Sequence, residues 1–155
     1  MRHEITEIER ELMLIGRHAT MAMLNAKPLE GRMERSSYVL LRRLHVEGPM
    51  SIGQLAEVFG LDTSTVNRQT ATLLRSGLAE RIPDPDGGMA RKLRITDEGL
   101  SRLEQERAWT LKGLASVLGD WSPEELSAFA DGLARFNASI AHRGGCHWPR
   151  PETAS

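Results

Sequence analysis

The sequence has a single cysteine, Cys146, among its 155 residues, so no intramolecular disulfide can hold the fold together. Aromatic side chains make up only 5% of the chain, which argues against a large aromatic-filled barrel or sandwich. No apolar run approaches the ~18 residues of a membrane span, and the first twenty residues contain four glutamates, unlike a signal peptide. A chain of this length can bury its own core. We therefore expect a soluble, cytoplasmic protein that makes no contact with membranes.

An excess of charge of either sign is also missing. The 20 Lys and Arg residues nearly balance the 21 Asp and Glu residues, for a net charge of -1. This balance excludes a uniformly basic nucleic-acid-binding protein, so any contact with DNA needs a local basic surface. There is no phosphate-binding loop, carboxylate pair or nucleophile–base spacing, so we expect neither an enzyme nor a cofactor.

A metal site is not expected in this chain either. His142, Cys146 and His147 are the candidate ligands near the C-terminus, and no second cluster stands at the spacing of a zinc site. Redox sensing by Cys146 has little support, because a reactive thiol needs a strongly cationic or helix-terminal setting. A solvated tail is the simpler interpretation.

Amphipathic helices are predicted at both ends of the chain, where apolar residues recur at alternating spacings of three and four. The first covers residues 5–26. Two more follow near the C-terminus, one from about Thr96 and one opened by the capping sequence Ser122-Pro123-Glu124-Glu125. One chain could hardly cover all three apolar stripes. We therefore predict that these helices pack against those of a second copy as a dimerisation layer.

The central segment predicts a winged helix–turn–helix. A helix over residues 34–46 precedes a short helix with a capping box, Ser51-x-x-Gln54, which stops at Gly60. A further helix spans about residues 64–76, and two short strands, 78–82 and 92–96, flank a run of turn formers. The expected fold is mainly α with a small antiparallel β-hairpin.

The predicted organisation has four parts. An N-terminal dimerisation helix (1–34) precedes the winged helix–turn–helix lobe (35–96), C-terminal dimerisation helices (97–142) and a flexible tail (143–155) without periodicity.

One face of the helix over residues 64–76 carries polar and basic side chains and no acid. The second helix of a helix–turn–helix enters the major groove, where Asn pairs with adenine and Arg with guanine. Arg75 suits a phosphate contact, and the basic side of the hairpin suits the adjacent minor groove or its phosphates. A merely solvated charged face is the alternative. The predicted DNA contacts are Ser64, Thr65, Asn67, Arg68, Ala71, Arg75, Arg91, Lys92 and Arg94.

Three stretches of the sequence resemble the MarR family of bacterial transcriptional regulators. They are Leu55-Ala56-x-x-Phe59-Gly60-Leu61-Asp62-x-Ser64-Thr65-Val66-Asn67-Arg68, Leu73-x-x-x-Gly77-Leu78-Ala79-x-Arg81 and Leu93-x-Ile95-Thr96-x-x-Gly99. The resemblance covers about residues 5–141 and implies an obligate homodimer on a pseudo-palindromic site in double-stranded DNA, usually a repressor. It also implies small anionic, often phenolic, inducers, bound between the dimer layer and the DNA-binding lobe.

The same resemblance places four side chains at the junction where such an effector would bind: His18, Tyr38, Arg42 and Trp109. Arg42 is the one suited to a carboxylate. Ordinary packing between helices is the alternative explanation for all four residues.

The wing departs from the family pattern. Family members usually carry Asp-x-Arg there, and the equivalent positions hold Gly87 and Met89. Asp86 lies one residue early and Arg91 two residues late. Either Arg91 takes the place of the usual arginine, or insertion into the minor groove is weaker. The second possibility keeps open a ligand- or protein-binding module of the same fold without specific DNA binding.

Overall fold

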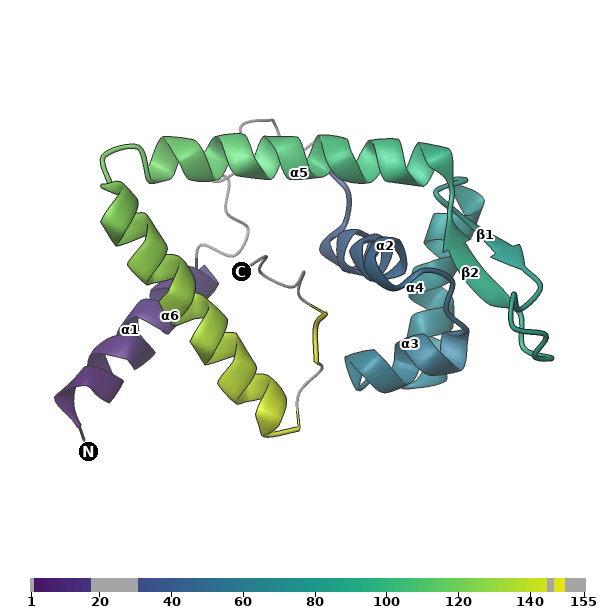
Figure 1. The fold of residues 1–155 in the computed structure, drawn as a ribbon, viewed down its shortest axis with the longest axis horizontal. Helices are drawn as coiled ribbons and strands as arrows, with labels where there is room; N and C mark the ends of the chain where they lie inside the picture. The colour runs from purple at the N-terminus through teal and green to yellow at the C-terminus, as the bar shows by residue number, and fades with distance from the viewer. Residues whose placement is uncertain (1, 18–30, 145–146, 150–155) are drawn as a thin grey trace. The chain divides into compact units, whose positions relative to one another are not determined.

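A computed structural model of the chain describes residues 2–17, 31–144 and 147–149. Two strands pair as an antiparallel hairpin among helices, so the predicted mainly α fold with a small hairpin is confirmed (Figure 1). Within these residues no helix is long and apolar enough to cross a membrane. The elements in chain order are α1 (His3–Arg17), α2 (Arg35–Glu47), α3 (Ile52–Phe59), α4 (Thr63–Arg75), β1 (Ala79–Ile82), β2 (Lys92–Ile95), α5 (Asp97–Val117) and α6 (Pro123–His142).

The chain divides into two compact units by its internal contacts. One consists of Met1–Arg32 and Arg107–Asp120, and the other of Met33–Glu106 and Trp121–Ser155. The division therefore cuts α5 between Glu106 and Arg107. The predicted assignment of residues 1–34 and 97–142 to a dimerisation layer stays a prediction.

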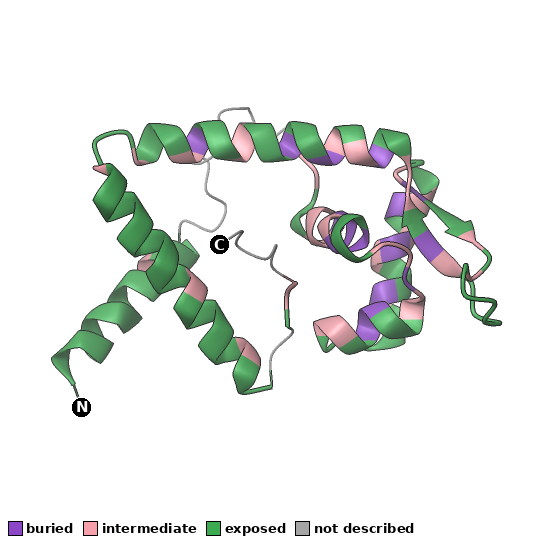
Figure 2. Cartoon of the chain, in the orientation of Figure 1, coloured by how far each residue is buried: buried purple, intermediate pink, exposed green. Residues whose placement is uncertain are grey.

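A single apolar core lies within Met33–Glu106, the segment that we call the lobe. Here α2 packs on α4 and β2, and α3 packs on α4 (Figure 1). Figure 2 shows buried residues on these elements and at intervals along α5. On α2, Leu40, Leu41 and Leu44 are buried, whereas His45 is exposed. The core consists of Leu40, Leu41, Leu44, Met50, Leu55, Ala56, Val66, Leu73, Ala79, Leu93 and Leu103.

The start signals predicted for α3 and α6 are confirmed as capping boxes. The Gln54 N–H donates to Ser51 Oγ at 3.1 Å, and the Ser51 N–H donates to Gln54 Oε1 at 2.9 Å. Ser122 and Glu125 repeat the arrangement at the start of α6, with donor–acceptor distances of 2.7 and 3.2 Å. Each box satisfies N–H groups that have no partner within the helix, which fixes the first residue of each helix.

The hairpin and α5 are joined by a compact corner. β1 and β2 pair in register from Ala79 opposite Ile95 to Ile82 opposite Lys92. The Thr96 hydroxyl donates to the Gly77 carbonyl at 2.7 Å and accepts from the Gly99 N–H at 3.0 Å. A Cβ at Gly99 would overlap the carbonyl oxygen of Leu78. The Thr96-x-x-Gly99 spacing is therefore explained by this close approach.

Within the stretch 143–155, His147 and Trp148 contact the lobe, and the predicted flexibility of this tail stays a prediction. The buried Arg43 donates from Nη1 to the His147 carbonyl at 2.7 Å and from Nη2 to Glu47 at 2.6 Å. Its guanidinium carbon lies 5.4 Å from the centroid of the Trp148 ring, which in turn lies 6.4 Å from the Phe59 ring. Cys146 lies outside the described residues.

Removing the Trp148 ring is expected to destabilise the lobe. The Trp148→Ala variant loses one cation–π contact and one aromatic pair, which together are worth about 1–2 kcal/mol. Urea unfolding of the full chain measures this loss, and hydrogen exchange should place it in α2 and α3. Trp148→Phe keeps a ring and serves as the control with a smaller loss. An alanine variant as stable as the wild type would contradict the contact.

Candidate nucleic-acid interface

The helix–turn–helix is formed by α3 and α4 with Gly60-Leu61-Asp62 between them. Gly60 ends α3 in the left-handed conformation (φ 60°), and the Leu61 N–H donates back to the Ala56 carbonyl at 3.0 Å. Val66, Thr70 and Leu73 bury one side of α4 in the core. The opposite side of α4 is thereby held toward solvent by the packing of the lobe.

The N-terminus of α4 is capped by Asp62, which lies just outside the helix predicted over residues 64–76. One carboxylate oxygen accepts from the Ser64 hydroxyl at 2.6 Å and from the Thr65 N–H at 2.7 Å. A side-chain acceptor just before an apolar-periodic segment is the usual signal for such a cap. The helix therefore starts at Thr63, one residue earlier than predicted.

The same hydrogen bonds change the acidity of Asp62. Donation by the Ser64 hydroxyl and by Thr65 lowers the pKa of the carboxyl from 3.8 to about 2, with the Arg68 charge acting in the same direction. Because the pKa of Asp62 is lowered in the folded protein, the stability that the cap contributes is complete above the ordinary pKa. That stability is lost as the pH falls through the lowered pKa. The cap is thus intact at neutral pH.

The acidity of Asp62 gives a direct test of this cap. In a carbon-detected NMR titration, Asp62 should remain about nine-tenths ionised at about pH 3, where an ordinary aspartate is mostly protonated. Asp62→Asn identifies the signal and, because asparagine also caps helices, should leave α4 starting at the same residue. An ordinary titration midpoint, near 3.8, would contradict the hydrogen bonds described above.

The outward side of α4 carries the predicted contact residues. Asn67 and Arg68 are exposed, as are Ser64 and Arg75, while Thr65 and Ala71 are half-buried. Arg75 Nη2 lies 3.4 Å from the Thr72 hydroxyl. No acidic residue occurs from Thr63 to Arg75, so beyond its capping Asp62 the helix presents donors and positive charge. Such a surface can bond base edges and phosphate oxygens.

In the hairpin, the predicted basic side is largely engaged by acids. The Lys92 side chain is only 12% exposed and its Nζ lies 3.3 Å from Asp84 Oδ1, so this residue is not the free outward cation that was predicted. Arg94 Nε donates to Glu80 at 3.0 Å across the two strands. Arg91 is exposed, and the described part of the chain holds no ion pair to it.

Comparisons with known proteins agree with this arrangement. A family model described as "MarR family" matches residues 33–87, which covers the helix–turn–helix and the first part of the wing. The chain is also 38% identical over 110 residues to the uncharacterized HTH-type transcriptional regulator YxaD of Bacillus subtilis (strain 168). That match covers 71% of this chain and 77% of the relative.

The chain belongs to the MarR family. It is therefore a transcriptional regulator with a DNA-binding helix–turn–helix, and the expectation that it is not an enzyme agrees with this membership.

Solved structures show the same fold. A MarR family protein from Bacillus stearothermophilus superposes with a TM-score of 0.73 at 23% identity, over 91% of this chain and 99% of that one. The PcaV transcriptional regulator from Streptomyces coelicolor, in complex with its natural ligand, superposes with a TM-score of 0.60 at 23% identity. That match covers 86% of this chain and 91% of PcaV.

The MarR resemblance implied a ligand site at four residues. Those that the structure describes do not all belong to the same compact unit. Tyr38 and Arg42 lie one turn apart on α2, and Arg42 Nη1 is 3.4 Å from the Tyr38 hydroxyl. Trp109 lies on the part of α5 in the other unit, where the Arg32 guanidinium carbon is 5.5 Å from its ring centroid. His18 lies outside the described residues. The ligand site stays a prediction.

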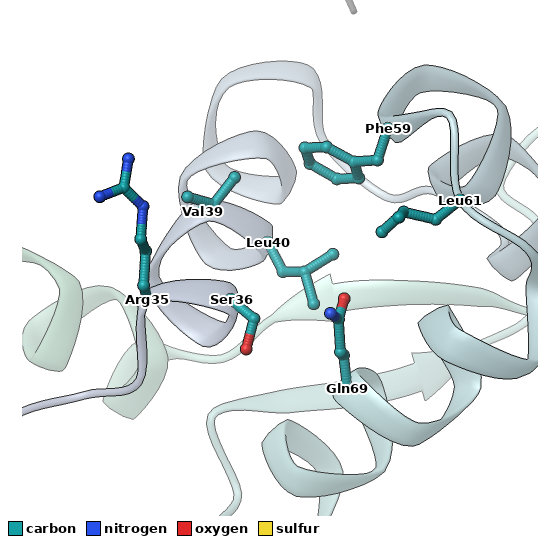
Figure 3. Close-up of a pocket in the computed structure, with 7 residues that line it drawn as sticks. All are labelled: Arg35, Ser36, Val39, Leu40, Phe59, Leu61 and Gln69. Atoms are coloured by element: carbon teal, nitrogen blue, oxygen red, sulfur yellow. The ribbon is translucent and has the colours of Figure 1, made fainter. Parts of the chain in front are cut away.

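A cavity that sequence reasoning did not indicate opens within the lobe of this MarR-family protein. Its volume is about 290 Å³, and it lies between α2, the end of α3 and α4 (Figure 3). Apolar side chains dominate its lining, and it shares no residue with the predicted ligand site. The lining residues are Arg35, Ser36, Val39, Leu40, Phe59, Leu61 and Gln69.

Proposed function

We propose that two copies of this chain bind a pseudo-palindromic operator and repress transcription, and that a small anionic or phenolic ligand releases them. The α4 helices of the two copies enter successive major grooves ~34 Å apart, and the wings contact the flanking DNA. Binding to chromosomal DNA places the acting protein in the bacterial cytoplasm.

The observation that carries the proposal is the outward side of α4. Asn67 and Arg68 are exposed on a helix without acidic residues, and the opposite side of that helix is fixed in the core. In this arrangement Arg68 bonds a guanine and Asn67 an adenine, while Ser64 and Thr65 bond phosphates or bases. The half-buried Ala71 is small enough to permit close approach, and Arg75 contacts a phosphate.

Exposed apolar stripes on α1 and α6 support the homodimer. Neither helix has a buried residue in the described chain (Figure 2). Apolar surface of this extent on a soluble protein marks an interface, and two copies of the same chain cover it symmetrically. The exposed apolar side chains are Ile5, Ile8, Leu12, Met13 and Ile15 on α1 and Leu126, Phe129, Leu133, Phe136 and Ile140 on α6.

PcaV has the same fold, and its solved structure contains its natural ligand. This complex supports release of our protein by a ligand. In our proposal Arg42 meets the acidic part of such a ligand and Tyr38 meets its aromatic part. In the proposed dimer, the distance between the two lobes either fits the operator or does not. A ligand lowers DNA affinity only to the extent that it binds more tightly to the conformation that does not fit.

Fluorescence anisotropy on DNA from upstream of the protein's own gene tests the proposal, with a random duplex and a salt series. The expected result is tight binding by two protomers that weakens steeply between ~50 and ~200 mM salt and far exceeds binding to the random duplex. Weak binding equal on both duplexes, repeated with duplexes selected from a random pool, would favour the ligand- or protein-binding module instead.

A further inference from the structure

The loop between β1 and β2 is organised around one carboxylate. Asp84 Oδ1 accepts from the Asp86 N–H at 2.9 Å and lies 3.3 Å from Lys92 Nζ, and the Asp84 carbonyl accepts from the Gly87 N–H at 3.0 Å. The hydrogen bond from the Asp86 N–H and the nearby Lys92 lower the pKa of Asp84. A side chain at Gly88 would overlap this carboxylate. The loop therefore has a defined shape that depends on its own residues.

The hairpin carries little net positive charge. Residues 80–94 contain four basic side chains (Arg81, Arg91, Lys92 and Arg94) and three acidic ones (Glu80, Asp84 and Asp86), for a net charge of +1. An exposed ion pair is weak enough for Arg94 to exchange Glu80 for a phosphate, but Glu80 would then lie beside the same phosphate. Accumulated positive charge is therefore a poor explanation of how this hairpin binds DNA.

Met89 is the large apolar side chain that the loop exposes to solvent. It is fully exposed, at 102% of its reference accessibility, and follows the two glycines Gly87 and Gly88. Because these two residues have no side chains, the backbone of the loop can approach a narrow groove of DNA closely. An unbranched thioether is flexible and apolar, and methionine is among the side chains that minor-groove proteins insert between base steps.

We propose that Met89 is the wing residue that enters the minor groove, as an apolar wedge beside a phosphate contact of Arg91. This inference rests on the proposed DNA binding. If Met89 acts in this way, binding by the wing depends on the width of the minor groove and on how easily base steps deform, rather than on charge. Flanking steps that unstack easily, such as TA, are then preferred.

Anisotropy with a duplex selected by the purified wild-type protein tests the inference. Met89→Ala should weaken binding about tenfold with an unchanged salt slope, because the lost contact is apolar. Met89→Leu should retain most of the affinity. Arg91→Ala is the matched control, and it should weaken binding while reducing the salt slope by about one.

The groove is identified with modified DNA. Replacing flanking adenines by 2,6-diaminopurine adds an amino group in the minor groove and leaves the major-groove edge unchanged. Wild-type binding should fall with this DNA, whereas Met89→Ala should lose little further. Equal affinities of wild type and Met89→Ala would overturn the inference, as would an equal effect of the modified DNA on both proteins. A wild type that selects no duplex would instead overturn the proposed function.

Discussion

The Leu133→Asp variant is expected to sediment as a folded monomer and to lose specific DNA binding. Leu133 lies in the middle of the apolar stripe of α6 and is 43% exposed in the single chain. If two copies bury this stripe against each other, the substitution places an unpaired carboxylate at the interface, and burial of an unpaired charge is strongly unfavourable. Two coupled lobes are needed for a two-fold site, so operator binding is lost with the dimer.

Ala138→Asp is the matched control for this substitution. Ala138 is also exposed on α6 but lies on the opposite side of the helix from the stripe, so the same new charge stays in water. Sedimentation velocity and circular dichroism of both variants separate loss of association from loss of folding. A Leu133→Asp protein that remained a folded dimer would contradict the placement of α6 in the interface.

The second large effect is expected at Arg68. Arg68→Ala should weaken binding to a specific duplex by ~1–3 kcal/mol, which is about 5- to 150-fold, and should relax the preference at one base pair. The reason is geometric, because an exposed guanidinium on the outward side of α4 can donate two hydrogen bonds to a guanine. Binding to a panel of single-base operator variants measures both effects.

Arg75→Ala provides the comparison, since a phosphate contact positions the helix without specifying sequence. That variant should weaken binding to every duplex by a similar factor and lower the salt slope by about one. An Arg68→Ala protein with the same uniform loss, and with base preferences unchanged, would show that Arg68 binds a phosphate and would contradict its assigned role.

The elements of the lobe could be predicted because their signals are local in sequence. Ser51 and Gln54 lie three residues apart and form the expected box, and Gly60 ends α3 where a left-handed residue was expected. The buried side of α4 follows directly from helical periodicity. The same reasoning could have identified Asp62 as the cap of α4, because an N-cap residue stands directly before the first residue of its helix.

Contacts between residues far apart in sequence could not be predicted in this way. On α5 the charged Glu106 is buried, whereas the neighbouring Arg107 is exposed. Glu106 accepts from the Met33 N–H at 2.9 Å and pairs with Arg102 at 3.2 Å. Periodicity treats a charged residue as exposed, whereas a buried charge depends on partners that only the fold brings close.

The same reason explains the differences at the candidate interface. Lys92 alternates with buried Leu93 and was therefore expected to lie free on the outward side of the hairpin. Its ammonium instead lies beside Asp84, which the curl of the loop brings back toward β2. Arg43 and Trp148 are likewise 105 positions apart in the printed sequence and meet only in the fold.

Changing the spacing of the two half-sites in a selected duplex tests the central claim most directly. The account predicts tight binding of two protomers when half-site centres lie about one helical turn apart, about 10 base pairs. Inserting five base pairs turns one half-site to the far face of the DNA, and affinity should fall to that of a single half-site. Equal affinity for both duplexes would show that the lobes do not act as a two-fold pair, and would contradict the proposed dimeric regulator.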